Sequence, residues 1–239
     1  MNVFALKIIA MITMLVDHIG YIFFPDVMLF RLIGRTAFPI FAFLLSQGFL
    51  HTHDKKKYIT KIGIAALITE IPFDLTFFDK SFFIEYQNVL VLFFIALTTL
   101  TLYEKILKKN KDGYYILILG IISSIISQAD YGFLGMILIL AFYFLSKNKD
   151  NYKPNSIMII FSTILFAIAE FSNELTYFNG GVLEFIKSTG FIYLGIIFAG
   201  IILSFYNTKL GMKNKIINII FYAFYPVHII VLYLISNII

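Results

Sequence analysis

The chain has 239 residues, of which 60% are hydrophobic and 14% are charged, with a mean hydropathy of +0.88. Soluble domains carry about 25% charged residues, so this composition excludes an ordinary water-soluble protein and indicates that much of the surface faces lipid. The formal charge of +5 does not indicate a nucleic-acid partner, because membrane proteins collect Lys and Arg in their cytoplasmic loops. The absence of cysteine excludes disulfides, a thiolate nucleophile and Cys-ligated metal.

Apolar segments long enough to cross a bilayer, which takes about 20 residues, follow one another along the chain. They predict an all-α fold, a single polytopic transmembrane domain over residues 1–239 with about nine spanning helices and a range of eight to ten. The expected spans are 3–24, 29–50, 58–78, 87–107, 114–129, 131–146, 155–172, 189–206 and 215–238. The fifth and sixth are short and should form a tight hairpin, and 173–188 is expected to be a loop with an interfacial turn.

Lysine gathers in alternate loops, after the second, fourth, sixth and eighth segments. The positive-inside rule places such loops in the cytoplasm, so the N-terminus is predicted to lie inside and the C-terminus outside. The lysines concerned are Lys55, Lys56, Lys57, Lys61, Lys105, Lys108, Lys109, Lys111, Lys147, Lys149, Lys153, Lys209, Lys213 and Lys215. The run Lys55–Lys57 is interpreted as a contact with lipid headgroups or, alternatively, with an anionic cytoplasmic donor.

Asp17 and His18 lie about four turns into the first span. An ionisable side chain inside a bilayer costs at least about 2.5–3.5 kcal/mol, so such residues are rare and usually functional. Neighbouring residues on a helix do not face each other, so a partner for His18 must come from another helix. A structural role for both residues is the alternative.

Two like-charged pairs at i, i+4 spacing follow, Arg31 with Arg35 and Glu70 with Asp74. Like charges at this spacing repel, so we expect the antiparallel second and third spans to pair Arg35 with Glu70 and Arg31 with Asp74. Such pairing is either a structural clamp or a device in which an arginine holds a phosphate or an acyl carbonyl.

The polar residues of different helices are predicted to lie at similar depths in the membrane. At 1.5 Å per residue, His18, Arg35 and Asp74 lie within about 9 Å of the outer ends of their helices, and His228 lies about 15 Å from the end of the last. The polar residues near other outer ends are Gln87, Asn88, Asp130 and Glu170. This layout predicts a buried site that is open to the outside and is built from both ends of the chain.

Motifs that are missing narrow the chemistry. The sequence has no glycine-rich nucleotide motif, no His-Glu-x-x-His and no Gly-x-Ser-x-Gly. Nucleotide hydrolysis, zinc proteolysis and a serine nucleophile are therefore not expected, and no metal site is predicted. The chemistry that is left is that of histidine, carboxylate and arginine.

Short motifs in order from residue 6 to about residue 230 resemble the TraX family of membrane proteins. The first and last contain the two intramembrane histidines, in Asp17-His18-Ile19-Gly20 and Tyr225-Pro226-Val227-His228. Between them lie Arg31-Leu32-Ile33-Gly34-Arg35, Phe38-Pro39-Ile40-Phe41, Glu70-Ile71-Pro72-Phe73-Asp74, Gln87-Asn88-Val89 and Asp130-Tyr131-Gly132-Phe133-Leu134-Gly135.

The resemblance implies an activity. The TraX family is named for a pilin acetylase of conjugative plasmids, which acetylates the pilin N-terminal amine. It is similar to a wider group of multi-pass acyltransferases that use cytoplasmic acyl-CoA, in which a histidine of the first helix is held to be essential. The expectation is therefore an enzyme of the bacterial cytoplasmic membrane. It would move an acetyl or other short acyl group from acetyl-CoA to an amine or hydroxyl of a protein, glycan or lipid at the outer face.

In this hypothesis His18 is the general base, since its neutral form predominates near pH 7. Asp74 or Glu70 orients it, and Asp17 is either catalytic or structural. Arg31 and Arg35 hold charge or polarise the acyl carbonyl. The acceptor side is expected to include Gln87, Asn88, Asp130, Tyr225 and His228, and the phosphates of CoA are expected to meet Lys55, Lys56 and Lys57.

Two other classes of function stay open. Intramembrane Asp, His and Glu also build the proton relays of a proton-coupled transporter or permease, although the repeated halves typical of many transporters are not visible here. A non-catalytic assembly factor for pili or the envelope would tolerate charge-neutral substitutions at His18 and His228.

Overall fold

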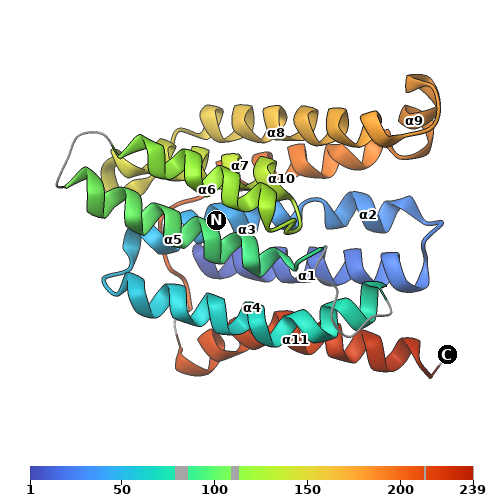
Figure 1. Ribbon diagram of the computed structural model, residues 1–239, viewed down its shortest axis with the longest axis horizontal. Coiled ribbons are helices and arrows are strands. Elements are labelled where there is room, and N and C mark those ends of the chain that lie inside the picture. Colours follow the sequence, from blue (N-terminus) through green and yellow to red (C-terminus); the bar gives the residue numbers. More distant parts are fainter. Residues whose placement is uncertain (79–85, 109–112, 213, 239) are drawn as a thin grey trace.

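The computed structural model describes residues 1–78, 86–108, 113–212 and 214–238. Within these ranges the chain is all-α, and the longer helices run side by side along the long axis of the molecule (Figure 1). The β-type contact in the same ranges is an isolated backbone bridge between Gln87 and Ala129. The prediction of an all-α fold is confirmed.

The nine predicted segments all form helices. The N-terminal half contains α1 (Val3–Phe23), α2 (Met28–Gly34), α3 (Ala37–His51), α4 (Lys55–Phe78) and α5 (Val89–Leu107). The C-terminal half contains α6 (Tyr114–Ile126), α7 (Gly132–Lys147), α8 (Ser156–Tyr177), α9 (Val182–Ser188), α10 (Leu194–Ser204) and α11 (Lys215–Ser236). Short 3₁₀ turns, η1 (Asp150–Tyr152) and η2 (Gly190–Tyr193), precede α8 and α10.

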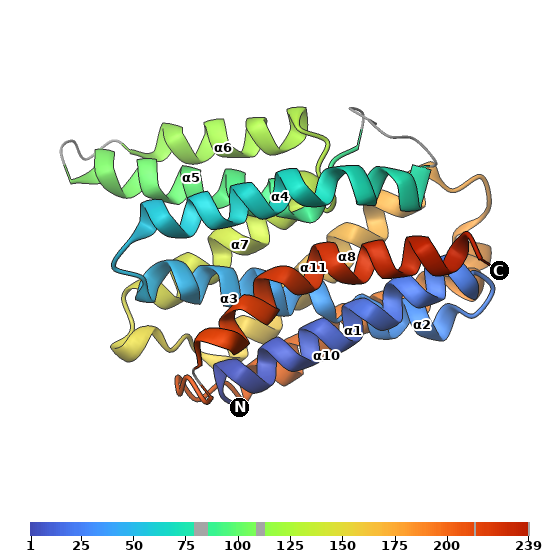
Figure 2. The ribbon, with the colours of Figure 1, turned by 90° about the horizontal axis from the view of Figure 1, so that it is seen from below.

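Helix α3 lies in the interior of the bundle, in contact with α1, α5, α7 and α10. Phe43 of α3 and Phe142 of α7 are both fully buried and meet edge to face, with ring centroids 5.5 Å apart. Helix α4 packs between α5 and α11, and α8 packs against α10. Helix α1 contacts α11, so the first and last helices lie side by side (Figure 2).

The second predicted span is broken at Arg35 and Thr36, between α2 and α3. Pro39 lacks the N–H that would donate to the carbonyl of Arg35, so the helical ladder is interrupted there. The Thr36 hydroxyl donates instead to the carbonyl of Gly195, at 3.1 Å. A Cβ at Gly195 would overlap the carbonyl of Leu32, so glycine lets the η2–α10 segment approach this break closely.

The segment 173–188 is mostly helical, and its prediction as a loop was wrong. Helix α8 extends to Tyr177, and α9 follows after a turn at Gly180 and Gly181. Phe185 of α9 is 3% exposed and packs against the rings of Phe171 and Phe178. The burial of these aromatic rings stabilises the extra helix, an effect that charge and hydropathy did not reveal.

Length and apolar composition qualify five of the described helices to cross a membrane, and the bent pair α9 with η2–α10 makes up to six. The five are α1, the combined segment Met28–His51, α5, α8 and α11. Helix α4 is long enough but carries several charges, whereas α6 and α7 have 13 and 16 residues. At 1.5 Å per residue α6 extends about 20 Å, less than the roughly 30 Å of a bilayer core.

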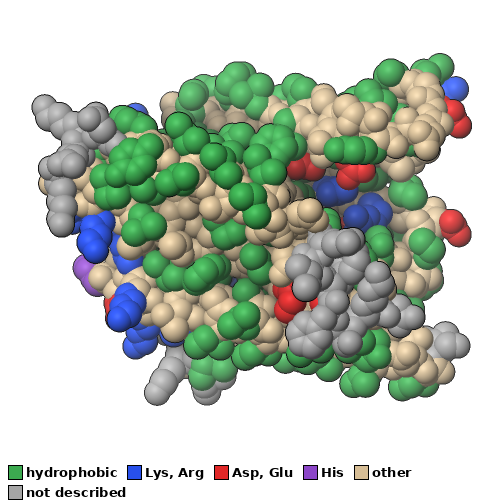
Figure 3. All heavy atoms as spheres, viewed as in Figure 1, with side chains coloured by type: hydrophobic (Ala, Val, Ile, Leu, Met, Phe, Trp, Pro, Cys, Tyr) green, Lys and Arg blue, Asp and Glu red, His purple; other side chains and the backbone are tan. Residues whose placement is uncertain are grey.

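Charge is unevenly distributed between the two ends of the bundle. Lysine side chains gather at one end, where α3 ends and α4 begins (left in Figure 3). Towards the other end the surface is hollowed, and arginines and carboxylates face the hollow (right in Figure 3). We refer to these as the lysine-rich end and, after the side that the lysine pattern predicts for it, the outer end.

Candidate functional site

His18 of α1 and His228 of α11 form a hydrogen-bonded pair. The Nδ1 atom of His18 lies 2.8 Å from Nε2 of His228, and the two rings are nearly parallel, with 12° between their planes. The Nδ1 atom of His228 lies 2.8 Å from the carbonyl oxygen of Phe224. Tyr225 and Phe77 pack edge-on against the His18 ring. The prediction that His18 finds its partner on another helix is confirmed.

The hydrogen-bond partners fix the tautomers of the neutral pair. A backbone carbonyl only accepts, so Nδ1 of His228 carries its proton and Nε2 of His228 is an acceptor. His18 must then donate from Nδ1, which leaves the lone pair on its Nε2. This is the tautomer that a general base acting through Nε2 requires.

Asp17, next to His18 in sequence, faces α2 instead. Its Oδ1 lies 2.8 Å from Nη1 of Arg31, and both side chains are largely buried. A Cβ at Gly34 would overlap the Asp17 carboxylate, so a glycine in α2 is what allows this close approach of the two helices. The ring of Tyr21 lies 5.3 Å from the Arg31 guanidinium.

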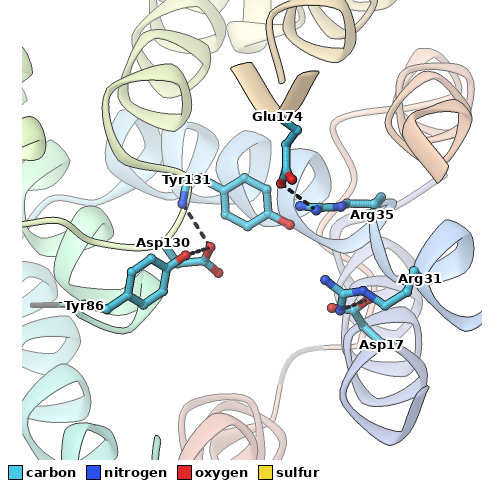
Figure 4. A network of polar contacts seen from close by, with 7 residues as sticks. All are labelled: Asp17, Arg31, Arg35, Tyr86, Asp130, Tyr131 and Glu174. Atoms are coloured by element: carbon cyan, nitrogen blue, oxygen red, sulfur yellow. Dashed lines mark hydrogen bonds and ion pairs between the residues drawn. The ribbon is translucent and has the colours of Figure 1, made fainter. Parts of the chain in front are cut away.

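A cavity of about 490 Å³ lies at the outer end, bounded by α2, α8 and the connection between α6 and α7. Charged side chains line it, namely Arg31, Arg35, Asp130, Glu170 and Glu174. Figure 4 shows the Asp17–Arg31 pair of α1 and α2 together with residues of three further segments. These are Tyr86 before α5, Asp130 and Tyr131 between α6 and α7, and Glu174 of α8, and Arg35 follows α2. Of the polar residues predicted to converge, Arg35, Asp130 and Glu170 line this cavity.

Arg35 is positioned by aromatic rings and one exposed acid. Its guanidinium carbon lies 5.9 Å from the ring centre of Tyr131 and 5.7 Å from that of Tyr193. Its Nη2 lies 3.4 Å from Oε1 of Glu174, whose side chain is 49% exposed. Glu170 is 6% exposed at the cavity wall and makes no hydrogen bond or ion pair within the described ranges.

Asp130 lies in the connection between α6 and α7. It accepts hydrogen bonds from the Tyr86 hydroxyl and from the backbone N–H of Tyr131, each at 3.0 Å. Burial raises the pKa of Asp130, and the nearby Arg35 and the Tyr86 hydroxyl oppose that rise. The backbone of Gln87 exchanges hydrogen bonds with Gln128 and Asp130, which anchors the connection.

The predicted pairing of the two arginines with the acids of α4 was wrong. Arg31 pairs with Asp17 and Arg35 with Glu174, because α2 ends at Gly34 and packs against α1 rather than α4. The carboxylate of Glu70 instead accepts a hydrogen bond from the Asn88 side chain.

The hydrogen-bond partner of Nδ1 of His18 is His228, and not an acid of α4. Asp74 is 1% exposed within α4. Asn88 caps the N-terminus of α5 through the N–H of Leu90, at 3.0 Å, and it is fully buried. Its geometry is that of a structural cap.

The lysines assigned to the donor differ from one another. Lys55 pairs with Glu104, and its ammonium lies 4.1 Å from the ring centre of Phe49. Glu104 also accepts a hydrogen bond from the Tyr143 hydroxyl at 2.7 Å. Lys56 and Lys57 are exposed at the start of α4. Lys55 is therefore neutralised by the protein itself.

Four cavities share walls from one end of the bundle to the other. A compartment of about 40 Å³ lined by His18 shares Asp130 and Tyr131 with the outer cavity. It shares Met14 and Tyr225 with an apolar chamber of about 140 Å³. That chamber in turn shares Lys7 with a cavity of about 470 Å³ at the lysine-rich end.

Sequence reasoning missed several residues of the outer cavity. Glu174 and Tyr86 were not singled out, and Tyr131 was named only within a family motif and given no role. The Tyr131 ring stacks on Phe38 with ring centres 3.8 Å apart. The left-handed backbone of Tyr131, with φ at 62°, turns the chain into α7. Tyrosine near a membrane surface is common, so composition gave no signal that the two tyrosines belonged to a site.

The chain is similar to known proteins over almost its whole length. The family model described as "TraX protein" matches residues 3–236. The chain belongs to the TraX family. The match runs from α1 into α11, so both histidines of the pair lie within the TraX domain. No solved structure matches the chain.

Two relatives are similar over nearly their whole length. "Probable fimbrial assembly protein FimC, serogroup H1" of Dichelobacter nodosus is 27% identical, and the match covers 97% of this chain and 94% of that protein. "Uncharacterized protein RP591" of Rickettsia prowazekii (strain Madrid E) is 28% identical, with 95% and 89% covered. The name of the first links one TraX-like protein to fimbrial assembly.

Proposed function

We propose that this integral membrane protein is an acyltransferase that moves an acetyl or other short acyl group from cytoplasmic acyl-CoA to an amine or hydroxyl acceptor at the outer face of the bacterial cytoplasmic membrane. The observation that carries the proposal is the His18–His228 pair, because the compartment that His18 lines adjoins the charged outer cavity. The TraX family resemblance and the relative named as a fimbrial assembly protein support a pilin N-terminus as the acceptor.

The proposal includes the topology. Nine helical segments cross the bilayer, α2 with α3 and α9 with α10 each counting as one, and the N-terminus is cytoplasmic. The support is the lysine pattern in alternate loops and the gathering of lysines at one end of the bundle (Figure 3). The lysine-rich end is then the cytoplasmic end.

In the transfer step His18 takes the proton of the acceptor nitrogen or oxygen as that atom attacks the thioester carbonyl. The new C–N or C–O bond forms and the C–S bond breaks. The proton held by His18 passes to the departing sulfur, so that free CoA is released. Arg35, which faces the outer cavity, stabilises the negative charge on the carbonyl oxygen, and Glu170 accepts hydrogen bonds from an amine acceptor.

The test is acyl transfer by the purified protein in nanodiscs, with acetyl-CoA as donor and a peptide bearing a free N-terminus as acceptor. We expect CoA release that depends on the acceptor and falls about 10²-fold or more in His18→Ala. His53→Ala, in the exposed loop between α3 and α4, is the matched control. Unchanged transfer by a folded His18→Ala protein would overturn the mechanism.

A proton-coupled transporter is the second candidate, favoured by the series of cavities that share walls from end to end. It predicts solute flux into liposomes with no acyl-CoA present. A non-catalytic assembly factor is the third, favoured by the name of the fimbrial relative. It predicts that His18→Asn restores fimbriation to a deletion strain as well as the wild-type gene does.

A further inference from the structure

Lys7 is a cation of α1 at the junction of two cavities. It lines both the cavity at the lysine-rich end and the apolar chamber next to that cavity. Its ammonium lies 4.6 Å from the ring centre of Phe221, and it has no acidic partner within the described ranges. Lys55, at the same end, differs because Glu104 neutralises it. Lys7 is therefore available to pair with an anion brought from outside the protein.

The chamber next to Lys7 suits an apolar chain. Its walls come from α1, α3, α4, α5 and α11, and they are formed largely by aliphatic and aromatic side chains such as Met11, Ile62 and Phe93. It shares Met14 and Tyr225 with the compartment that His18 lines. A flexible chain that enters past Lys7 would therefore end beside the compartment that His18 lines.

The distance between Lys7 and His18 fits a chain that runs through the apolar chamber from one to the other. Lys7 and His18 are on the same helix, eleven residues apart in sequence. At 1.5 Å per residue this corresponds to about 16 Å along the helix axis. The extended pantetheine arm of CoA, from its phosphate to its sulfur, has a similar length. A phosphate at Lys7 would thus place a thioester carbonyl near His18.

We infer that Lys7 binds a phosphate of the acyl donor and that the apolar chamber holds the arm that carries the acyl group to His18. This inference rests on the proposed function and replaces Lys55–Lys57 as the donor site. Two donors share the chemistry of a phosphate joined to an acyl-bearing chain, a CoA thioester and a membrane phospholipid. Met14, 8% exposed at the boundary of the chamber and the His18 compartment, is the side chain past which the acyl group moves.

The experiment is calorimetric titration of the protein in nanodiscs with acetyl-CoA and, separately, with S-acetyl-pantetheine, which has no phosphate. We expect Lys7→Met to weaken acetyl-CoA binding about tenfold or more and to leave S-acetyl-pantetheine binding unchanged. Lys7→Arg keeps the charge and should retain acetyl-CoA binding. The unchanged binding of S-acetyl-pantetheine shows that Lys7→Met is folded. Lys149→Met, at an exposed position after α7, is the matched control.

A second measurement separates the two donors. Transfer of a labelled acyl group is followed from acetyl-CoA, and from phospholipid in nanodiscs without acyl-CoA. Loss of transfer from acetyl-CoA or from phospholipid in Lys7→Met supports the phosphate site. The donor whose transfer is lost is the one whose phosphate Lys7 binds. Equal acetyl-CoA affinity and equal transfer in wild type and a folded Lys7→Met overturn the site while leaving the acyltransferase intact. Absence of transfer by the wild type from both donors overturns the proposed function, whereas the calorimetry still tests Lys7.

Discussion

Nδ1 of His18 and Nε2 of His228 lie 2.8 Å apart although 210 residues separate them in the chain. The contact joins the first helix to the last beside the compartment that His18 lines, which shares wall residues with both the outer cavity and the apolar chamber. The carbonyl of Phe224, behind His228, fixes the direction of both hydrogen bonds. The last helix is therefore part of the site rather than an additional anchor.

The first prediction concerns the acceptor atom that His228 offers to His18. His228→Gln keeps a side-chain oxygen able to accept from Nδ1–H of His18, whereas His228→Leu removes every acceptor. We expect His228→Leu to lower the rate of acyl transfer about 10²-fold and His228→Gln to lose less. The cause is the loss of the tautomer with a free Nε2 lone pair.

The chemical shifts of ¹⁵N-labelled histidine report this tautomer directly, and the chain has four histidines to assign. In the wild type the His18 signals should be those of an Nδ1–H imidazole. A His18 spectrum that is the same in wild type and His228→Leu would contradict the orienting role of His228. That readout does not depend on the acyl acceptor being known.

The sequence predicted that His18 needs a partner from another helix, but not which helix supplies it. The pairing of His18 with His228 depends on α1 packing against α11, a contact between the two ends of the chain that local patterns do not encode. The arginine pairings failed for a related reason. Spacing at i, i+4 placed Arg31 and Arg35 on one face of a continuous helix, whereas the structure ends α2 at Gly34 and packs it on α1.

The helical segments themselves followed from hydropathy, because each apolar stretch of the chain is bounded by polar residues. The cavity residues did not, since Tyr131 and Glu174 reach the site through a left-handed turn and through the extension of α8 beyond residue 172. Such features depend on tertiary packing, which overrides local preference.

The second prediction is that the Asp17–Arg31 pair is stabilising only as a pair. Removing one partner leaves a largely buried charge without compensation, so Asp17→Asn should destabilise the fold by about 1–3 kcal/mol. The double variant Asp17→Asn with Arg31→Gln should recover part of that loss. Thermal unfolding in detergent measures each variant. Additive losses in the double variant would show that the two side chains do not interact.

The third prediction tests the close approach of α1 and α2. Gly34→Ala places a Cβ against the Asp17 carboxylate and should destabilise the protein by about 1–3 kcal/mol through overpacking. Gly181→Ala is the matched control, because no atom lies within 4 Å of its Cβ position. The same unfolding measurement applies. Equal stability of the two variants would mean that α1 and α2 are further apart than described.

The fourth prediction concerns topology, and the lack of cysteine makes it direct to test. Single cysteines are introduced as Lys56→Cys at the lysine-rich end and Asn179→Cys beyond α8, both at exposed positions. In intact cells a membrane-impermeant maleimide should label Asn179→Cys, and Lys56→Cys should react only after lysis. Labelling of both cysteines from outside would contradict a cytoplasmic lysine-rich end.

The fifth prediction assigns Glu170 to the amine acceptor. Its carboxylate lines the outer cavity, is 6% exposed and has no hydrogen-bond partner within the described ranges. Glu170→Gln keeps the size of the side chain and removes its charge, so the KM for an amine acceptor should rise about tenfold while the KM for acetyl-CoA stays the same. Glu184→Gln, at an exposed position of α9, should change neither constant. A carboxylate that contacts only the acceptor changes only the KM for the acceptor. A rise in the KM for acetyl-CoA instead would therefore place Glu170 on the donor side of His18.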